Sequence, residues 1–171
     1  INFPFFKKVD PKDAAEKHDG KSGWTFTHNP FSMPIPEHVE WLLNGEKIDQ
    51  ITTTQYDLVC NGYEVGGGSI RAHRQDLLKA TYKIMGYSDE ETKQSVGHML
   101  EAFSFGTPPH GGIALGLDRH VMLLNGDTSL KEAIAFPMTS TGRTAVMDAP
   151  SSLEKEQLDE LGLSFLKKSK S

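Results

Sequence analysis

The dipeptide Asn61-Gly62, between two runs of strand-forming residues, most constrains how this chain can fold. Both residues tolerate the positive φ of a type I′ turn, so Tyr56–Arg71 is predicted to form a β-hairpin with a two-residue loop. Such a loop fixes the pairing register as Cys60 with Tyr63, Val59 with Glu64, Leu58 with Val65, and Asp57 with Gly66. Asp57 and Glu64 are then diagonal neighbours on one face of the sheet.

Three consecutive glycines, Gly66, Gly67 and Gly68, follow this carboxylate pair. In the simplest interpretation, Asp57 and Glu64 merely form the solvated face of a hairpin. Glycines weaken a strand, however, and often mark a bulge or a place where a ligand approaches the backbone. Two carboxylates that repel each other are most easily kept ionised by a cation, and such oxygen ligands suit magnesium carried in with phosphate groups. The pattern therefore favours a ligand site.

Arg71 lies seven residues beyond Glu64, which would place the two side chains on opposite faces of a regular strand. A single β-bulge would reverse the face that Arg71 occupies. We predict such a bulge within residues 66–69, with Arg71 turned toward the carboxylates as a bidentate fork for a carboxylate or phosphate.

A second informative segment is Gly111–Leu124, an apolar, glycine-spaced run interrupted by Asp118 and Arg119. It predicts a buried strand that runs into a helix. The segment alone is a weak nucleotide signal, since it lacks the glycine spacing and Lys-Ser/Thr ending of a P-loop. Asp118 and Arg119 could be no more than a capping acid and its partner.

Together these segments resemble the C-terminal half of the catalytic domain of a class II aminoacyl-tRNA synthetase, specifically the bacterial type of aspartyl-tRNA synthetase. The hairpin resembles that family's active-site hairpin, and Gly116-Leu117-Asp118-Arg119 resembles its third class-defining motif. Further matching stretches are Thr107–Gly112, Ala135–Thr139 and Asp148–Ser151. The resemblance implies an α+β fold, a class II synthetase-like antiparallel sheet flanked by helices.

The resemblance also implies roles for individual residues. Glu64 would contact ATP through magnesium, with Asp57 as the second carboxylate beside the metal. Arg71 would grip the side-chain carboxylate of the substrate L-aspartate. Arg119 would lie against the adenine and reach the terminal phosphate, and a planar guanidinium suits that task better than an ammonium. The strand end that carries the nucleotide would be formed by Gly116, Leu117 and Asp118.

His28, in Thr27-His28-Asn29-Pro30-Phe31, resembles the first histidine of the family's loop that closes on the bound amino acid. Many bacterial members carry a second histidine where this chain has Asn29, so the sequence departs from the pattern there. Taken alone, His28 would be interpreted as a surface or structural histidine. The other histidines lack metal-ligand spacing, and no zinc is predicted.

The coarse secondary structure places these motifs within one α+β unit. Strands are expected over 1–6, 24–26 and 134–136. Helices are expected over 36–43 and 75–87. A further helix is expected to begin at the capping box Ser88–Glu91, and a terminal helix is expected after Ser151. Residues 7–23 are expected to be a mobile connection, and residues 166–171 a frayed tail.

The family's first and second motifs, its inserted domain and its anticodon-binding domain have no counterpart in residues 1–171. We therefore expect this chain to be the C-terminal portion of the catalytic domain of a larger, homodimeric enzyme. In isolation it would lack part of the active site and expose surface that is normally interior.

Composition agrees with an ordinary globular domain, at 37% hydrophobic and 24% charged residues. The net charge of −5 argues against a main nucleic-acid surface, so tRNA is expected to bind mainly through other parts. The single cysteine, Cys60, excludes an internal disulfide. No apolar run reaches membrane-spanning length, and a cytoplasmic protein without membrane contact is expected.

The predicted function is that of an aspartate–tRNA ligase fragment, inactive alone, from an enzyme that uses ATP and magnesium to form aspartyl-adenylate and charges tRNA. Two alternatives stay open. One is a related catalytic core, either an asparaginyl-tRNA synthetase or an ammonia-dependent asparagine synthetase. The other is a non-catalytic, synthetase-derived binding paralogue.

Overall fold

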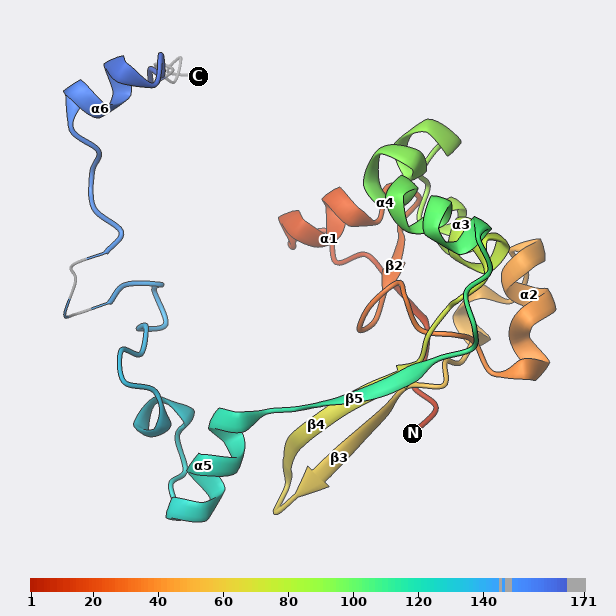
Figure 1. Ribbon diagram of the computed structural model, residues 1–171, viewed down its shortest axis with the longest axis horizontal. Coiled ribbons are helices and arrows are strands. Elements are labelled where there is room, and N and C mark those ends of the chain that lie inside the picture. The colour runs from red at the N-terminus through yellow and green to blue at the C-terminus, as the bar shows by residue number, and fades with distance from the viewer. Residues whose placement is uncertain (145, 147–148, 166–171) are drawn as a thin grey trace. The chain divides into compact units, whose positions relative to one another are not determined.

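The computed structural model describes residues 1–144, 146 and 149–165. The chain divides into two compact units, Ile1–Leu117 and Asp118–Ser171. The first unit contains, in chain order, β1 (Phe6–Lys8), α1 (Ala14–Asp19), β2 (Trp24–Phe26), the 3-10 helix η1 (Pro36–His38), α2 (Val39–Asn44), η2 (Ile48–Gln50), β3 (Tyr56–Cys60), β4 (Tyr63–Ile70), α3 (Gln75–Ile84), α4 (Asp89–Ser104) and β5 (Gly111–Leu115) (Figure 1). Antiparallel sheets with separate helices confirm the predicted α+β class.

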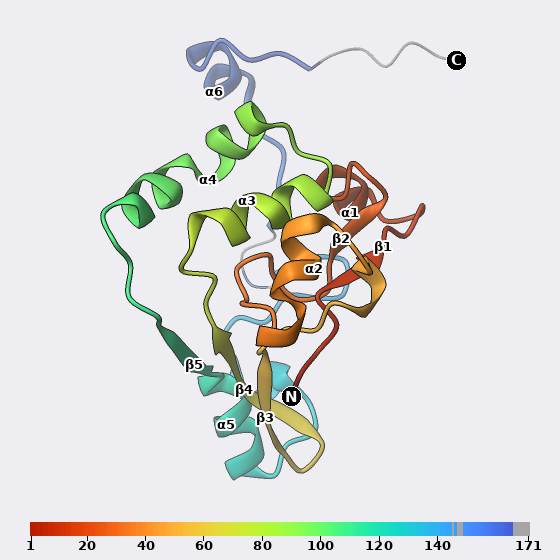
Figure 2. The same ribbon diagram turned by 90° about the vertical axis from the view of Figure 1, so that its right-hand side faces the viewer.

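The first unit is built around two small antiparallel sheets. One pairs β1 with β2, and the other has the strand order β3-β4-β5. Helices α2, α3 and α4 gather beyond the end of the larger sheet where β4 ends and β5 begins (Figure 2). This arrangement leaves the faces of the larger sheet available for a site.

Helix α3 links two clusters of buried apolar side chains. Its Leu77 and Leu78 are both fully buried, and they belong to different clusters. The first cluster comprises Phe5, Phe6, Leu42, Ile51, Ala72, Leu77, Ile84 and Met85. The second comprises Leu78, Tyr82, Val96 and Leu100, with Met99 and Phe103 packed against it. The helix therefore anchors the body from which β4 and β5 extend.

The predicted helices are present, with small changes at their ends. The expected helix over 36–43 is η1 followed by α2, and the expected helix over 75–87 is α3, which ends at Ile84. It stops early because Gly86 adopts a positive φ of 91° and turns the chain. The predicted capping box is confirmed, since Ser88 and Glu91 cap each other at the start of α4.

The carboxyl group of Glu91 accepts a hydrogen bond from Lys21 Nζ at 2.5 Å and others from the backbone N–H and hydroxyl of Ser88. These bonds, with Lys21 first, lower the pKa of Glu91 from 4.5 to about 2. A lowered carboxyl pKa in the folded state stabilises the fold above the ordinary pKa, and that contribution is lost as the pH falls from 4.5 toward about 2. Carboxyl-carbon NMR should give a midpoint near 2 for Glu91, moving toward 4.5 in Lys21→Met. A wild-type midpoint near 4.5 would contradict the Lys21 contact.

The hairpin turn is confirmed, with positive φ at both Asn61 (52°) and Gly62 (83°). The predicted pairs Cys60–Tyr63 and Val59–Glu64 are also confirmed. The next two pairs are wrong by one residue, because Leu58 pairs with Gly66 and Asp57 with Gly67. The extra residue in β4 is Val65, so the bulge precedes the glycines and does not fall within residues 66–69. From Gly66 to Ile70 the ladder with β5 is unbroken.

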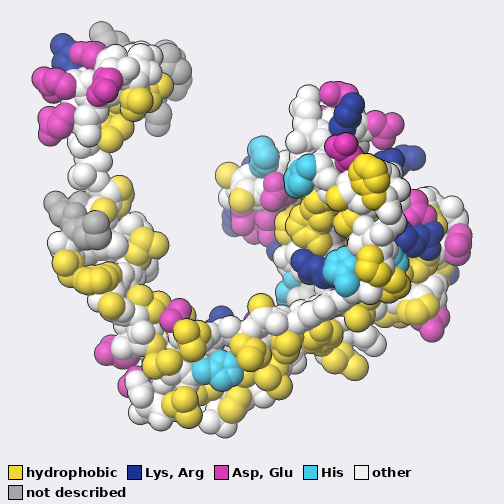
Figure 3. All heavy atoms as spheres, in the orientation of Figure 1, with side chains coloured by type: hydrophobic (Ala, Val, Ile, Leu, Met, Phe, Trp, Pro, Cys, Tyr) yellow, Lys and Arg dark blue, Asp and Glu magenta, His cyan; other side chains and the backbone are white. Residues whose placement is uncertain are grey.

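Strand β5 is not the buried strand that the sequence predicts. It runs into a helix as expected, but all five of its residues are exposed. Its only strand partner among the described residues is β4, which leaves its other edge and its apolar side chains uncovered. Exposed apolar side chains lie along this sheet, among them Leu58, Val59, Ile113 and Leu115 (Figure 3).

At the amino end, the strand expected over 1–6 is wrong for residues 1–5, because β1 comprises only Phe6–Lys8. The range 7–23 contains the rest of β1 and helix α1. Asp13 caps that helix by accepting from the backbone N–H groups of Ala15 and Glu16. The mobility expected for this range stays a prediction.

The second unit begins at Asp118, within α5 (Leu117–Asn125), and also contains η3 (Leu130–Ala133) and α6 (Lys155–Glu160). Helix α6 is the helix expected after Ser151. The strand predicted over 134–136 is wrong, because the N–H of Ile134 closes the η3 turn by bonding to Lys131. The predicted frayed tail, 166–171, lies outside the described residues. No helix in the described ranges is long and apolar enough to cross a membrane.

Candidate functional site

A polar pocket of about 320 Å³ opens on the face of the larger sheet. It brings together four of the predicted site residues: His28, Asp57, Glu64 and Arg71. The remaining lining comes from Asn29, Gln55, Gly67, Gly68 and Ala114. Because Arg71 shares this pocket with both carboxylates, the predicted consequence of the bulge is confirmed although its position is not.

Gly67 keeps the space between the two carboxylates open. A Cβ atom built at this glycine would lie 3.1 Å from Asp57 Oδ1 and 3.1 Å from Glu64 Oε1. Both oxygens therefore face the volume that a side chain at this position would fill. The bulge at Val65 makes this possible, since it puts Glu64 and Gly67 on one face at an odd separation.

This arrangement fits a magnesium ion. Mg²⁺ prefers oxygen ligands and is commonly held by one or two carboxylates while phosphates and waters complete its shell. Asp57 and Glu64 supply the two carboxylates, and Gly67 leaves room between them. Among the described residues no group of three or more His, Cys, Asp or Glu side chains could hold a metal, so a fully protein-enclosed metal site is not formed there.

Arg71 is held in place by a chain of hydroxyl groups. Its guanidinium donates to Ser69 Oγ at 3.1 Å, and Ser32 Oγ donates to Ser69 Oγ at 3.1 Å. Both serines are buried. The guanidinium carbon also lies 6.0 Å from the ring centre of Phe31. These contacts restrict the side chain of Arg71 before any ligand binds, which favours recognition of a planar anion.

The segment after β2 supplies His28 and Asn29 to the pocket. His28 packs edge-on against Phe3, with ring centres 4.9 Å apart. The side-chain oxygen of Asn29 accepts from the backbone N–H of Phe31 at 2.9 Å. It also lies 3.1 Å from Ser32 Oγ, so the single hydroxyl proton of Ser32 is directed to either Asn29 or Ser69. Asn29, where the sequence departs from the family pattern, thus orders the turn that leads to Ser32. Ser32 in turn contacts Ser69, the residue that holds Arg71.

A second hollow, of about 380 Å³, adjoins the pocket through Gly67, Gly68, Arg71 and Ala114. Residues 110–113 line its other side, and the carbonyl of His110 accepts from the backbone N–H of Arg71 at 2.9 Å. The hydroxyl of Tyr56 donates to the carbonyl of Gly112 at 2.8 Å. The two hollows together form a continuous lining across β4 and β5.

The predicted motif residues follow β5 directly. The backbone N–H of Gly116 donates to the carbonyl of Val65 at 2.9 Å, which joins this glycine to the bulge. Leu117 begins α5 and is exposed. Asp118 and Arg119 follow in the first turn of α5 and belong to the second unit, whereas the lining of both hollows comes from the first unit.

Sequence reasoning missed several residues around Arg71, among them Ser32, Ser69 and Gln55. For two of them a signal was available. Ser69 precedes Arg71 by two residues and Gln55 precedes Asp57 by two, so strand periodicity places each on the face of its functional neighbour. Ser32 comes from a distant segment, and nothing in its local sequence indicates the contact.

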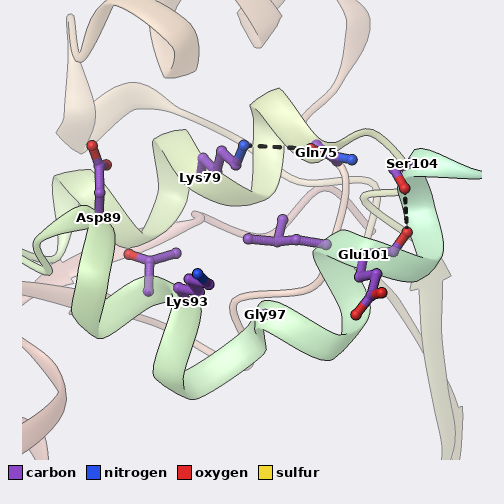
Figure 4. A pocket seen from close by; sticks show the side chains of 9 residues that line it. Gln75, Lys79, Asp89, Lys93, Gly97, Glu101 and Ser104 are labelled. Atoms are coloured by element: carbon purple, nitrogen blue, oxygen red, sulfur yellow. Dashed lines mark hydrogen bonds between the residues drawn. The ribbon is translucent and has the colours of Figure 1, made fainter.

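Another hollow, of about 450 Å³, lies between α3 and α4 and does not have the features of the site (Figure 4). Two of its polar side chains bond within their own helices: Lys79 Nζ donates to Gln75 in α3, and Ser104 Oγ donates to the carbonyl of Glu101 in α4. No set of polar groups converges there as it does around Arg71, so the smaller polar pocket is the better candidate.

Comparison with known protein families decides the affiliation. Residues 1–140 match the model described as "tRNA synthetases class II (D, K and N)", which covers both hollows and the third motif. The chain belongs to this family. Its antiparallel sheet and carboxylate-bearing hairpin are therefore those of a class II synthetase domain.

Among curated proteins the chain is similar to bacterial aspartate–tRNA ligases. It is 48% identical to the Macrococcus caseolyticus "Aspartate--tRNA ligase", covering 78% of this chain and 22% of that protein. It is 46% identical to the Bacillus subtilis "Aspartate--tRNA(Asp/Asn) ligase", covering 90% of this chain and 26% of that protein. It is 45% identical to the Corynebacterium diphtheriae "Aspartate--tRNA(Asp/Asn) ligase", covering 99% of this chain and 28% of that protein. The chain thus spans about a quarter of the length of these curated relatives.

Two solved structures confirm the class II synthetase fold. The Entamoeba histolytica aspartyl-tRNA synthetase aligns with a TM-score of 0.52 and 23% identity, covering 67% of this chain and 21% of that one. The Pyrococcus horikoshii asparaginyl-tRNA synthetase aligns with a TM-score of 0.51 and 20% identity, covering 78% and 31%. At these sequence identities the two structures show the fold alone, and they do not distinguish an aspartate enzyme from an asparagine enzyme.

Proposed function

We propose that this chain is the C-terminal portion of the catalytic domain of an aspartate–tRNA ligase and that it supplies part of the ATP and L-aspartate sites. The observation that carries the proposal is the single pocket in which Arg71 stands beside the carboxylates of Asp57 and Glu64. The names of the bacterial relatives support it.

In this proposal each residue acts by binding and orienting. Asp57 and Glu64 would hold the magnesium ion that accompanies ATP, and Arg71 binds the side-chain carboxylate of aspartate. His28 closes over the amino acid. Arg119 lies on the adenine, next to the strand end Gly116–Asp118. The bound metal would stabilise negative charge that develops on the phosphates.

The proposed reaction needs no protein nucleophile. The α-carboxylate of aspartate attacks the α-phosphorus of ATP, the bond to the β-phosphate oxygen breaks, and aspartyl-adenylate and pyrophosphate form. The aspartyl group then passes to the terminal ribose of tRNA and AMP leaves. Catalysis is therefore chiefly positioning by fixed charges, and groups already ordered like Arg71 are most effective at it.

The exposed apolar side chains of the larger sheet suggest that other parts of the enzyme pack against it. Exposed apolar side chains on β3 and β5 need a cover, and in the proposed enzyme other parts of the catalytic domain supply it and complete the ATP site. A homodimer, tRNA binding mainly through other domains, and a cytoplasmic location complete the proposal for the whole protein.

An asparagine-specific enzyme is a weaker candidate because the pocket presents a preordered guanidinium, which discriminates a carboxylate from an amide. ATP–pyrophosphate exchange by the complete gene product tests the assignment. We expect exchange that depends on L-aspartate and is at background with L-asparagine. Exchange with asparagine instead would assign the related core, and no exchange with either amino acid would favour a non-catalytic binding paralogue.

A further inference from the structure

Gln55 is a buried polar residue with an unused side chain. It is 8% exposed and lines the polar pocket. Its backbone N–H donates to Thr53 Oγ1 and its carbonyl accepts from the backbone N–H of Asn2. The side-chain amide has no hydrogen-bond partner in the described parts of the chain. Because Gln55 lines the pocket and its amide makes no hydrogen bond within the described protein, the amide is available to a ligand there.

The strand register shows where this amide stands. Tyr56 pairs with Gly68 and Asp57 with Gly67. Extending this register by one residue beyond β3 would place Gln55 opposite Ser69. Ser69 is the residue whose hydroxyl accepts from the guanidinium of Arg71. Gln55 directly precedes β3 and lines the same pocket as Asp57. Gln55 therefore lies at the Arg71 end of the pocket.

The charges nearby indicate which end of the amide a ligand would meet. Arg71 is the cation of this pocket and attracts an anionic group, whereas the carboxylates of Asp57 and Glu64 face the volume above Gly67. An anion held by Arg71 can accept further hydrogen bonds, since a carboxylate has about four acceptor sites. The amide nitrogen of Gln55 offers two donors.

We propose that Gln55 is a substrate-binding residue whose Nε2 donates a hydrogen bond to the side-chain carboxylate of the amino acid gripped by Arg71. This inference rests on the proposed function and deepens it, because it adds a second determinant for a carboxylate at the same site. It is also consistent with the place of Gln55 in the lining of the pocket that contains Arg71.

The test uses ATP–pyrophosphate exchange by the complete gene product carrying Gln55→Met, which keeps the shape of the side chain and removes the donor. A hydrogen bond to a charged group corresponds to about a 10- to 100-fold change in affinity. We expect the KM for L-aspartate to rise by that factor while the KM for ATP stays within about twofold. The matched control is Gln94→Met, on the exposed surface of α4, which should leave both KM values unchanged.

A second variant, Gln55→Glu, fixes the direction of the hydrogen bond. A carboxylate at this position repels the substrate carboxylate, so the KM for aspartate should rise at least as far as in Gln55→Met. If Gln55→Glu keeps the wild-type KM for aspartate, the residue instead accepts a hydrogen bond from the substrate ammonium, and the proposal is overturned.

Other outcomes are equally decisive. Unchanged aspartate KM in Gln55→Met overturns the proposal, and so does a joint rise of both KM values with a lowered thermal midpoint, which would mean a structural role. Failure of the proposed function is recognised separately, because the wild-type protein would then show no aspartate-dependent exchange at all.

Discussion

Replacing Arg71 with leucine is expected to abolish aspartate-dependent ATP–pyrophosphate exchange by the complete gene product while leaving much of its ATP binding intact. Arg71 is the cation that shares the pocket with Asp57 and Glu64, and its guanidinium is already held by Ser69. Removing one partner of a buried charged pair costs about 2–5 kcal/mol, or roughly 30- to 5,000-fold in affinity. Leucine is similar in bulk to the aliphatic stem, so the loss should concern charge more than packing.

Two further variants separate charge from geometry. Arg71→Lys keeps the charge but not the planar fork, and it should recover only part of the activity. Arg74→Leu is the matched control, because Arg74 is an exposed arginine whose guanidinium bonds to Asp76. It should leave the KM for aspartate unchanged. Aspartate-dependent exchange that survives Arg71→Leu would remove Arg71 from the amino-acid site.

The turn of the hairpin could be predicted from sequence because it is a local property. Asn61 and Gly62 are among the few residues that accept positive φ cheaply, and they adopt it. The position of the bulge could not be predicted in the same way. Val65 occupies it and is buried, at 3% exposure, although the neighbouring glycines seemed the easier place for an irregularity.

The glycines are used for close approach instead. Gly67 leaves space between two carboxylates, and Gly68 lies against the backbone of β5. Such contacts join segments that are far apart in sequence, and single-sequence patterns carry no information about them. The same reason explains why the contact of Ser32 with Ser69 was missed, whereas the faces of Asp57 and Gln55 follow from strand periodicity.

The exposure of β5 shows a second limit. Its apolar, glycine-spaced sequence predicts burial on both faces, but among the described residues only β4 pairs with it. A hydrophobic pattern indicates that a segment is suited to burial, and it does not indicate which segment covers it. In the proposed enzyme, the cover belongs to other parts of the catalytic domain.

The close approach at Gly68 leads to the second large effect, which we expect from Gly68→Ala. A Cβ atom at this position would lie 1.9 Å from the carbonyl oxygen of Gly112 and 3.0 Å from Ile113 Cα. Both are backbone atoms, so no side-chain rotation can relieve the overlap. The β4–β5 ladder must separate, and the cost should reach about 3 kcal/mol or more, at the upper end of overpacking substitutions.

Gly112→Ala is the control, since a Cβ atom at that glycine meets nothing within 4 Å although the residue stands in the same ladder. Hydrogen exchange of the complete gene product, followed by mass spectrometry, is the appropriate measurement because it reads β5 directly. Gly68→Ala should strip amide protection from residues 111–116, whereas Gly112→Ala should leave it near the wild-type level. Equal protection in both variants would mean that β4 and β5 are not packed this closely. Because Arg71 directly follows β4 and both hollows are lined in part by this ladder, its separation should remove aspartate binding together with strand order.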